Sequence, residues 1–349
     1  MKNLREITLP ELEVMMVDMG EPKFRAKQVH EWVWQKFAAD IQDMTNLPKA
    51  LREKLAEIFF IPKVKMHHSQ YSSDGTIKNR LRLHDGYYVE SVLIPTEKRM
   101  TACVSSQVGC SLSCKFCATG YMDRKRNLDF DEIVDEVTLL NELAQKHYNK
   151  NLSNIVFMGM GEPLLNYKNM MKAIERITSP EGLGMSPRRI TVSTAGVAKM
   201  IKQLGDDKVR FKLALSLHAP TDHKRNEIMP INESNNITVL IEALNYFYQA
   251  TGNEITFEYI LFKNFNDSIK DADDLIKIYR KVPADLINII EYNPIDDARF
   301  EKPDEDVVDD FMDHLKANRV NARLRRSRGK DIDAACGQLA NVDHENLEG

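Results

Sequence analysis

Three cysteines in one short segment carry the strongest chemical signal in this sequence. The segment reads Cys110-Ser-Leu-Ser-Cys114-Lys-Phe-Cys117, which has the spacing C-x-x-x-C-x-x-C. Three thiolates on one loop can hold three corners of a 4Fe-4S cluster and leave one iron open to another ligand. The alternatives are a zinc site completed by a distant histidine, or buried cysteines without a ligand. Structural zinc prefers paired C-x-x-C knuckles, and the sequence holds no second pair, so a cluster is the favoured interpretation.

The two remaining cysteines stand apart from this segment. Five cysteines are too few for a disulfide scaffold in a chain of 349 residues, and their placement indicates metal or redox chemistry in a reducing compartment. Cys336 lies near the C-terminus between Ala335 and Gly337, which leave its thiol unshielded, although a lone cysteine is by default a small buried hydrophobe. For Cys103, at the end of a predicted strand, a core residue and a reactive thiol are both open interpretations.

The elements that must position these thiols alternate between strand and helix patterns. Apolar or β-branched strands are predicted at 100–106, 153–159, 189–194, 210–217, 255–262, 286–291 and 320–326. Helices are predicted between them at 130–146, 167–177, 197–204, 238–250, 268–280 and 304–317. This rhythm predicts an α/β fold with a parallel sheet, and about six units, fewer than the eight of a closed barrel, predict a partial (β/α)6 barrel. Chemistry in such a fold gathers at the C-terminal ends of the strands.

Smaller units flank this α/β core, which we place at 100–339. Residues 1–60 are predicted to form a helical accessory domain, with helices at Glu11–Asp18, Phe24–Phe37 and Pro48–Phe59. Residues 61–99 are predicted to form a short β-rich connector, in which turns at 72–75 and 84–86 bound the strands Lys78–Leu83 and Tyr87–Pro95. The polar tail 340–349 is expected to fray.

Composition excludes several classes of protein. The chain is 43% hydrophobic and 29% charged, with 48 Lys+Arg against 52 Asp+Glu, which is typical of a globular protein of about two domains and not of a disordered or fibrous one. No apolar stretch approaches the roughly 20 residues that cross a bilayer, and the start lacks the apolar core of a signal peptide. We therefore expect a cytoplasmic protein without a membrane partner.

With Phe116 before the third cysteine and the α/β repeat behind it, the cysteine segment resembles the radical S-adenosylmethionine (SAM) superfamily. The phrase Arg328-Gly-Lys-Asp-Ile-Asp-Ala-Ala-Cys336-Gly-Gln-Leu339 narrows the resemblance to the RlmN/Cfr family of RNA adenine methyltransferases. The resemblance covers Glu90 to Leu339, and the helical N-terminal unit more loosely. It implies one 4Fe-4S cluster per chain, held by Cys110, Cys114 and Cys117, and two SAM molecules per turnover.

The resemblance also assigns the residues that contact SAM. The first two lie in the turn Met158-Gly-Met-Gly161-Glu162-Pro163, where glycine permits close backbone approach and the carboxylate can accept from the SAM ammonium. The others follow later strands, and the whole set is Gly161, Glu162, Ser193, Ser216, Leu217, His218 and Asn293. Any one of these polar residues taken alone is as readily a strand-end cap.

Two separate roles for cysteine follow from the family mechanism. Carbon 2 of adenine is an electron-poor amidine carbon, so it cannot attack a SAM methyl as a nucleophile and a radical route is needed. The resemblance implies that SAM methylates the thiolate of Cys336, and that a deoxyadenosyl radical from a second SAM activates that methyl to add to the ring. It further implies that Cys103 releases the product through a transient disulfide with Cys336, and that Glu90 is the proton acceptor.

Basic residues recur beside the expected site, although the net charge of −4 does not attract nucleic acid. They are Arg124, Lys125, Arg126, Arg188, Arg189, Lys224, Arg225, Arg323, Arg325, Arg326, Arg328 and Lys330. Their position suits an RNA backbone held over the site with the target base unstacked. The resemblance implies 23S ribosomal RNA and transfer RNA as substrates, a reducing partner such as flavodoxin, and a monomer.

Three alternatives stay open on the sequence. The nearest is methylation of carbon 8 of the same ribosomal adenine, the Cfr branch of the family, which confers antibiotic resistance. The residues of the segment Gly161-Glu-Pro-Leu-Leu-Asn-Tyr167 resemble the carbon 2 branch and favour it. The others are a radical SAM activator of another enzyme and a non-catalytic iron-sulfur RNA-binding protein, and neither has a use for a methyl-carrying Cys336.

Overall fold

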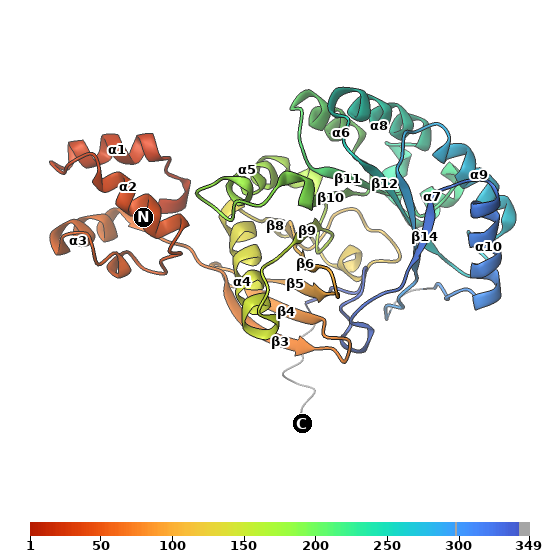
Figure 1. Cartoon of the computed structure of the whole chain (residues 1–349), viewed down its shortest axis with the longest axis horizontal. Helices are drawn as coiled ribbons and strands as arrows, with labels where there is room; N and C mark the ends of the chain where they lie inside the picture. The colour runs from red at the N-terminus through yellow and green to blue at the C-terminus, as the bar shows by residue number, and fades with distance from the viewer. Residues whose placement is uncertain (297–298, 342–349) are drawn as a thin grey trace.

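A curved sheet of ten strands runs through the part of the chain that the computed structural model describes, residues 1–296 and 299–341 (Figure 1). Seven of these described strands are parallel neighbours: β6 (Met100–Cys103), β9 (Asn154–Phe157), β10 (Ile190–Thr194), β11 (Lys212–Ser216), β12 (Ile255–Leu261), β13 (Leu286–Glu291) and β14 (Ala322–Arg325). Every residue of β12 is buried, as expected for a strand covered on both faces.

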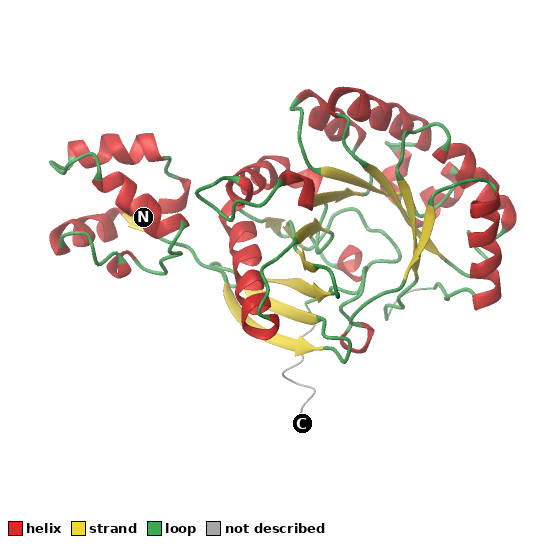
Figure 2. Cartoon of the chain, in the orientation of Figure 1, coloured by secondary structure: helices red, strands yellow, loops and turns green. Residues whose placement is uncertain are grey.

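Helices cover the outer face of this sheet (Figure 2). The crossover helices are α4 (Phe130–Tyr148), α5 (Tyr167–Thr178), α6 (Ala198–Asp206), α8 (Ile237–Thr251), α9 (Ile269–Tyr279) and α10 (Glu305–Ala317). Each buries one stripe, and in α5 the buried positions Met170, Ala173, Ile174 and Ile177 recur at helical spacing. The strand-helix alternation and the open parallel sheet confirm the expected partial α/β barrel.

Two details differ from the predicted elements. The strand predicted at 100–106 ends at Cys103, because Ser106 and Gln107 turn away and donate to the carbonyl of Met160. A short helix that was not predicted, α7 (Asp222–Ile228), follows β11, and Thr221 caps it by accepting from the backbone of Lys224.

The strands of the connector belong to the same sheet as the core. β3 (Lys65–Tyr71), β4 (Ile77–Arg82) and β5 (Tyr88–Pro95) are antiparallel, and β5 pairs with β6. Residues 61–99 therefore extend the parallel sheet instead of forming a separate hairpin unit.

The segment 328–333, which we call the strap, links the two edges of the sheet. β14 and β3 are the end strands. After β14, the backbone of Gly329 donates to Asp74 at 3.0 Å, and Asp331 accepts from the hydroxyl of Ser72 at 2.6 Å. Asp74 and Ser72 lie in the β3–β4 turn, so the strap crosses the open side of the barrel on its way to Cys336.

The N-terminal unit contains α1 (Leu9–Asp18), α2 (Arg25–Trp34) and α3 (Lys49–Ile58), with a two-residue parallel pair, β1 (Lys2–Asn3) and β2 (Phe59–Phe60). The second helix ends before the predicted Phe37, which has a positive φ of 49°. Arg5 anchors the unit to α4 through a buried ion pair of 2.7 Å with Asp135. Within the described ranges, every helix is too short or too polar to cross a bilayer.

Candidate active site

The three clustered cysteines lie on the loop between the short strands β7 (Gln107–Val108) and β8 (Arg126–Asn127). Gly109 begins this loop with a φ of +75°, and a Cβ there would meet the carbonyl oxygen of Asp123 at 2.2 Å. The backbone of Lys115 donates to Ile228 at 3.0 Å, which fixes the loop against α7. The loop is thus folded tightly around its cysteines.

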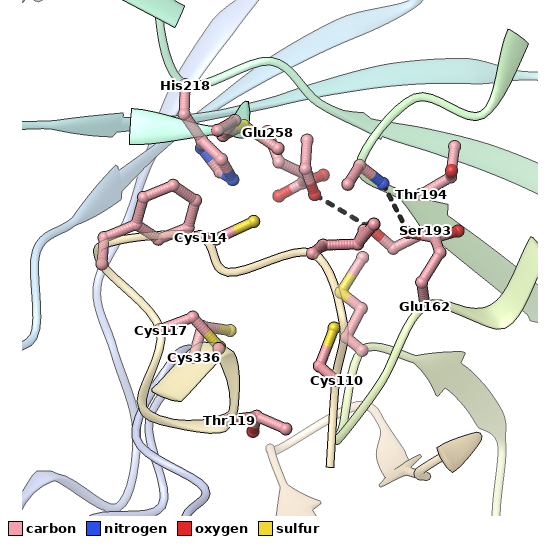
Figure 3. A pocket seen from close by; sticks show the side chains of 18 of the residues that line it. Cys110, Cys114, Cys117, Thr119, Glu162, Ser193, Thr194, His218, Glu258 and Cys336 are labelled. Carbon is pink, nitrogen blue, oxygen red and sulfur yellow. Dashed lines mark hydrogen bonds between the residues drawn. The ribbon is translucent and has the colours of Figure 1, made fainter. Parts of the chain in front are cut away.

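All three thiols face one pocket (Figure 3). Burial raises the pKa of Cys110 to about 11, and burial together with the neighbouring thiols raises the pKa of Cys114 well above its usual value. Thiolates at these positions therefore need a cationic partner, which a metal centre supplies.

The donor set fits a cluster better than a single ion. Within the described ranges, no group of three or more His, Cys, Asp or Glu side chains is arranged to hold one metal ion. A four-iron cluster spreads three cysteines over three different irons, so its ligands need not converge on one point. Three thiols in one pocket match that requirement.

The glycine-rich turn after β9 forms a second wall of the pocket. Gly161 has a φ of +91°, and a Cβ there would meet Gln107 Cβ at 2.5 Å, so only glycine fits. Glu162 is buried, and burial raises its pKa to about 7 although three hydrogen bonds oppose the rise. Its oxygens accept from the backbone of Ala195 at 2.7 Å and of Leu164 at 3.0 Å. Glu162 therefore ties the loop after β9 to the loop after β10.

The predicted polar residues at later strand ends divide into two groups. Ser193, Ser216 and His218 line the pocket, and the two serine hydroxyls lie 3.3 Å apart. His218 packs edge-on against Phe116, and burial followed by the charge of Arg225 lowers its pKa to about 3. The neutral imidazole accepts at Nδ1 from the backbone of Ile260.

Leu217 and Asn293 lie behind the pocket wall in the described chain. The carbonyl of Leu217 accepts from Arg225 Nε at 3.1 Å. Asn293 donates to the hydroxyl of Ser327 at 2.9 Å and to the carbonyl of Cys336 at 3.4 Å. The structure thus uses Asn293 to hold the backbone that carries Cys336.

Cys336 lies in the same pocket as the clustered cysteines, although it is more than two hundred residues away in sequence. The carbonyl of Gly337 accepts from the backbone of Ala118 at 2.7 Å, and that of Leu339 accepts from the hydroxyl of Thr119 at 2.6 Å. Figure 3 shows its sulfur beside that of Cys117, and the two thiols influence each other electrostatically. The segment after the strap therefore brings the lone cysteine to the cluster loop.

Cys103 is buried at the end of β6, behind the pocket. Burial raises its pKa to about 12, and the nearby Cys336 adds to this rise. All five cysteines, each within the described ranges, are free thiols, so the predicted pairing of Cys103 with Cys336 is not formed in this structure.

Glu90 faces away from the pocket in the described structure. It is 1% exposed on β5, and its Oε2 accepts from the backbone of Ala340 at 2.9 Å and of Asn341 at 3.2 Å. Its other oxygen lies 3.8 Å from the ammonium of Lys78. The prediction of a frayed tail is therefore wrong for Ala340 and Asn341, because Glu90 binds their backbone, and 342–349 lie outside the described residues.

Arg225, which the sequence places among the RNA-facing basic residues, is buried beside the pocket instead. Its side chain is fully buried, and its guanidinium donates to the carbonyls of Ala195 at 2.5 Å and of Ser216 at 3.2 Å, as well as to Leu217. It thereby joins the loops after β10 and β11 beside Cys114. Lys224 pairs with Asp271 at 2.5 Å, and its side chain is 30% exposed.

A second cavity, of about 870 Å³, lies on the other side of Cys336. Its basic lining residues are Arg99, Arg188, Arg189, Arg210, Lys212, Arg323, Arg325, Arg326 and Arg328. Five residues line both this arginine-lined cavity and the thiol pocket, namely Met158, Glu258, Ile290, Arg325 and Cys336. Cys336 is therefore part of the wall between the two.

Comparison with known proteins adds a family to this geometry. Residues 2–61 match the family model described as the ribosomal RNA large subunit methyltransferase N-terminal domain, and residues 104–276 match the radical SAM superfamily. The chain is 55% identical over 339 residues to a probable dual-specificity RNA methyltransferase RlmN of Cytophaga hutchinsonii, covering 97% of this chain and 93% of the relative. It is 43% identical over 342 residues to the dual-specificity RNA methyltransferase RlmN of Anaeromyxobacter, covering 97% and 90%.

A solved structure is similar over nearly the whole chain. The crystal structure of a radical SAM methyltransferase from Sphaerobacter thermophilus superposes with a TM-score of 0.90 at 39% identity, covering 97% of this chain and 99% of that one. The likeness therefore includes the helical unit, the sheet and the segment that carries Cys336.

Proposed function

Because this chain belongs to the RlmN family of radical SAM RNA methyltransferases, we propose that it methylates carbon 2 of an adenine in 23S ribosomal RNA and of the adenine beside the anticodon in transfer RNA. The observation that carries the proposal is the position of Cys336 between a thiol-lined pocket and an arginine-lined cavity. A radical SAM activator or a structural RNA-binding protein would have no use for a thiol in that wall.

The cofactors of the family are a 4Fe-4S cluster and SAM. When bound, they supply a methyl group and a 5′-deoxyadenosyl radical. Cys110, Cys114 and Cys117 would hold the cluster. The pocket wall for SAM would be formed by Gly161, Glu162, Ser193, Ser216 and His218, while Leu217 and Asn293 support it from behind.

Cys336 carries the methyl carbon between the two cavities. Its thiol would lose a proton, and the sulfur would bond to the methyl carbon as the bond between that carbon and the sulfonium sulfur of SAM breaks and S-adenosylhomocysteine leaves. The negative charge of the Cys336 sulfur lies close enough to the guanidinium of Arg325 to raise the pKa of the arginine. The S-methyl group would then give up a hydrogen atom to the deoxyadenosyl radical, which would leave as 5′-deoxyadenosine, and its carbon would bond to carbon 2 of the adenine. The adduct would lose the proton of carbon 2 and return one electron to the cluster, which leaves RNA and enzyme joined through a methylene bridge.

Cys103 and Glu90 would act in releasing the product. Cys103 lies near enough to Cys336 for their charges to interact. Its thiolate would attack the Cys336 sulfur and form a disulfide, and the methylene carbon would leave with the electron pair and take up a proton to become the product methyl group. Glu90 can accept a proton from the substrate only after Ala340 and Asn341 leave its carboxylate. That role therefore requires the chain after Cys336 to move.

The partners follow from this chemistry. RNA is the substrate, and an electron donor is needed, for which a flavodoxin is our proposal. We also propose that the enzyme acts as a monomer in the cytoplasm, where its RNA substrates are.

The test is nucleoside analysis of RNA treated with the reconstituted protein, SAM and a reductant. We expect 2-methyladenosine in digests of 23S ribosomal RNA fragments and of transfer RNA, detected by mass spectrometry against synthetic standards. Appearance of 8-methyladenosine instead would replace the proposal by the carbon 8 alternative, and absence of any methylated adenosine would refute both.

A further inference from the structure

Glu258 is a buried carboxylate that the mechanism above does not use. It lies in the middle of β12, is 3% exposed, and is one of the five residues that line both cavities. Figure 3 shows it at the upper side of the pocket, near His218. A carboxylate in an otherwise apolar buried strand is unfavourable unless its oxygens find partners.

One oxygen of Glu258 is satisfied and the other is not. Oε1 accepts from the amide of Asn288 at 2.6 Å and from the hydroxyl of Thr256 at 3.2 Å. Oε2 is buried and has no hydrogen-bond partner among the described residues. Arg325 stands 3.6 Å away, which is an ion pair but too long for a hydrogen bond. A buried acceptor without a donor is rare in folded proteins, and a ligand donor would explain it.

We propose that Oε2 of Glu258 accepts a hydrogen bond from the exocyclic amino group of the target adenine, and so selects adenine over 6-oxo purines. The inference rests on the proposed function. In adenine, carbon 2 and the amino group lie on the Watson–Crick side of the ring, so a base whose carbon 2 faces Cys336 turns its amino group toward the same wall. Flipped bases are read through that edge.

The chemistry of the carboxylate supports this choice of base. An ionised carboxylate only accepts hydrogen bonds, and the amino group of adenine is a donor. The carbonyl at the same place in inosine or guanine is an acceptor and would leave two acceptors facing each other. Burial raises the pKa of Glu258, and the charge of Arg325 opposes that rise.

The neighbouring side chains also determine how the side-chain amide of a glutamine at position 258 would be oriented. Arg323 donates through Nε to Oδ1 of Asn288 at 2.6 Å. Arginine is a donor only, so Asn288 must present its NH₂ group to Glu258. In E258Q the glutamine carbonyl would therefore take the place of Oε1, and its NH₂ group would take the place of Oε2. The variant presents a donor where the wild type presents an acceptor.

The experiment measures binding of two RNA hairpins that differ only at the target nucleotide. Anticodon stem-loops with adenosine or inosine are titrated with reconstituted protein and SAM, without reductant, and followed by fluorescence anisotropy. We expect the wild type to prefer adenosine about tenfold, the size of one mismatched base contact. In E258Q this preference should vanish or reverse.

Two further variants separate recognition from stability. E258D keeps an acceptor but withdraws it, so it should weaken binding of the adenosine hairpin without favouring inosine. E136Q is the matched control: Glu136 on α4 is fully buried and also has one oxygen without a partner among the described residues, but it lines neither cavity. It should keep the wild-type preference.

The outcomes distinguish this inference from the proposed function. Methylation of Cys336 by SAM is read in the wild-type preparation by mass spectrometry. If Cys336 is methylated but E258Q keeps the adenosine preference, or the wild type has none, the inference is overturned and the proposed function stands. If Cys336 stays unmethylated in the wild type, the proposed function itself fails.

Discussion

The thiol pocket and the arginine-lined cavity share one wall but differ in the side chains that line them. The thiol pocket gathers three cysteines, a neutral buried histidine and glycine turns whose backbones leave no room for side chains. The arginine-lined cavity is larger and carries guanidinium groups from strands and strand ends. The first suits a compact cofactor held by fixed atoms, and the second suits a flexible polyanion. A thiol in the shared wall is accessible from both cavities. Substitutions can therefore impair the thiol pocket and the arginine-lined cavity separately.

Removal of the shared thiol should have the largest effect. In C336A we expect RNA methylation to be lost entirely, because the nucleophile that carries the methyl carbon is gone. SAM binding, measured by equilibrium dialysis, should be kept, because the three cluster cysteines and the glycine turn at Gly161 are untouched. C103A serves as the matched control, since it should still take up a methyl group on Cys336. Residual methylation of RNA by C336A would show that Cys336 does not carry the methyl group.

Arg225 tests the thiol pocket alone. R225M removes a buried guanidinium from the carbonyls of Ala195, Ser216 and Leu217, and leaves them unsatisfied. We expect a loss of about 3 kcal/mol in the free energy of unfolding, measured in urea. R225K should lose less, because it keeps the charge and one donor group. A stability equal to that of the wild type would contradict the assigned role.

The exposed arginines test the other cavity. In the double variant R188Q/R189Q we expect RNA binding to weaken about tenfold, and the slope of log affinity against log salt to fall by roughly one to two. Cys336 methylation should be unaffected. K199Q/K202Q removes the same charge from exposed positions on α6, outside either cavity, and should bind RNA as the wild type does. An equal loss of RNA affinity in the two double variants would mean that the arginine-lined cavity is not the RNA site.

The strap should give the smallest effect. Burial opposes ionisation of Asp74, but hydrogen bonds from Thr76, Gly329 and Ser72 outweigh it and lower its pKa to about 2. The stabilisation by Asp74 is therefore present above the ordinary aspartate pKa of about 4 and is lost as pH falls toward 2. Because the group is partly exposed, we expect D74N to lose only about 1 kcal/mol at neutral pH. Urea unfolding of both proteins at two pH values checks this. The difference in free energy of unfolding between the wild type and D74N should shrink toward low pH, and a difference that grows there would contradict the prediction.

The α/β core and the cluster loop could be predicted because they depend on local periodicity and spacing. The strand-end residues came from the family resemblance, and two of them, Leu217 and Asn293, are not among the residues that line the pocket. The sequence did not predict the partners of Glu90 or the burial of Arg225, which arise only when distant segments meet. Asn341 lies 251 residues from Glu90, and no local sequence pattern predicts that contact. Glu258 had a usable signal, since it is the one charged residue in the apolar run Ile255–Leu261, and such a residue indicates a functional cavity.

The most direct test of the central claim is mass spectrometry of the tryptic peptide Asp331–Gly349, which contains Cys336 because no lysine or arginine follows Lys330. The protein is reconstituted, incubated with SAM carrying a labelled methyl group, and then given RNA and a reductant. We predict that the label appears on Cys336 first and afterwards in adenosine. A peptide that stays unlabelled while adenosine becomes labelled would contradict the account.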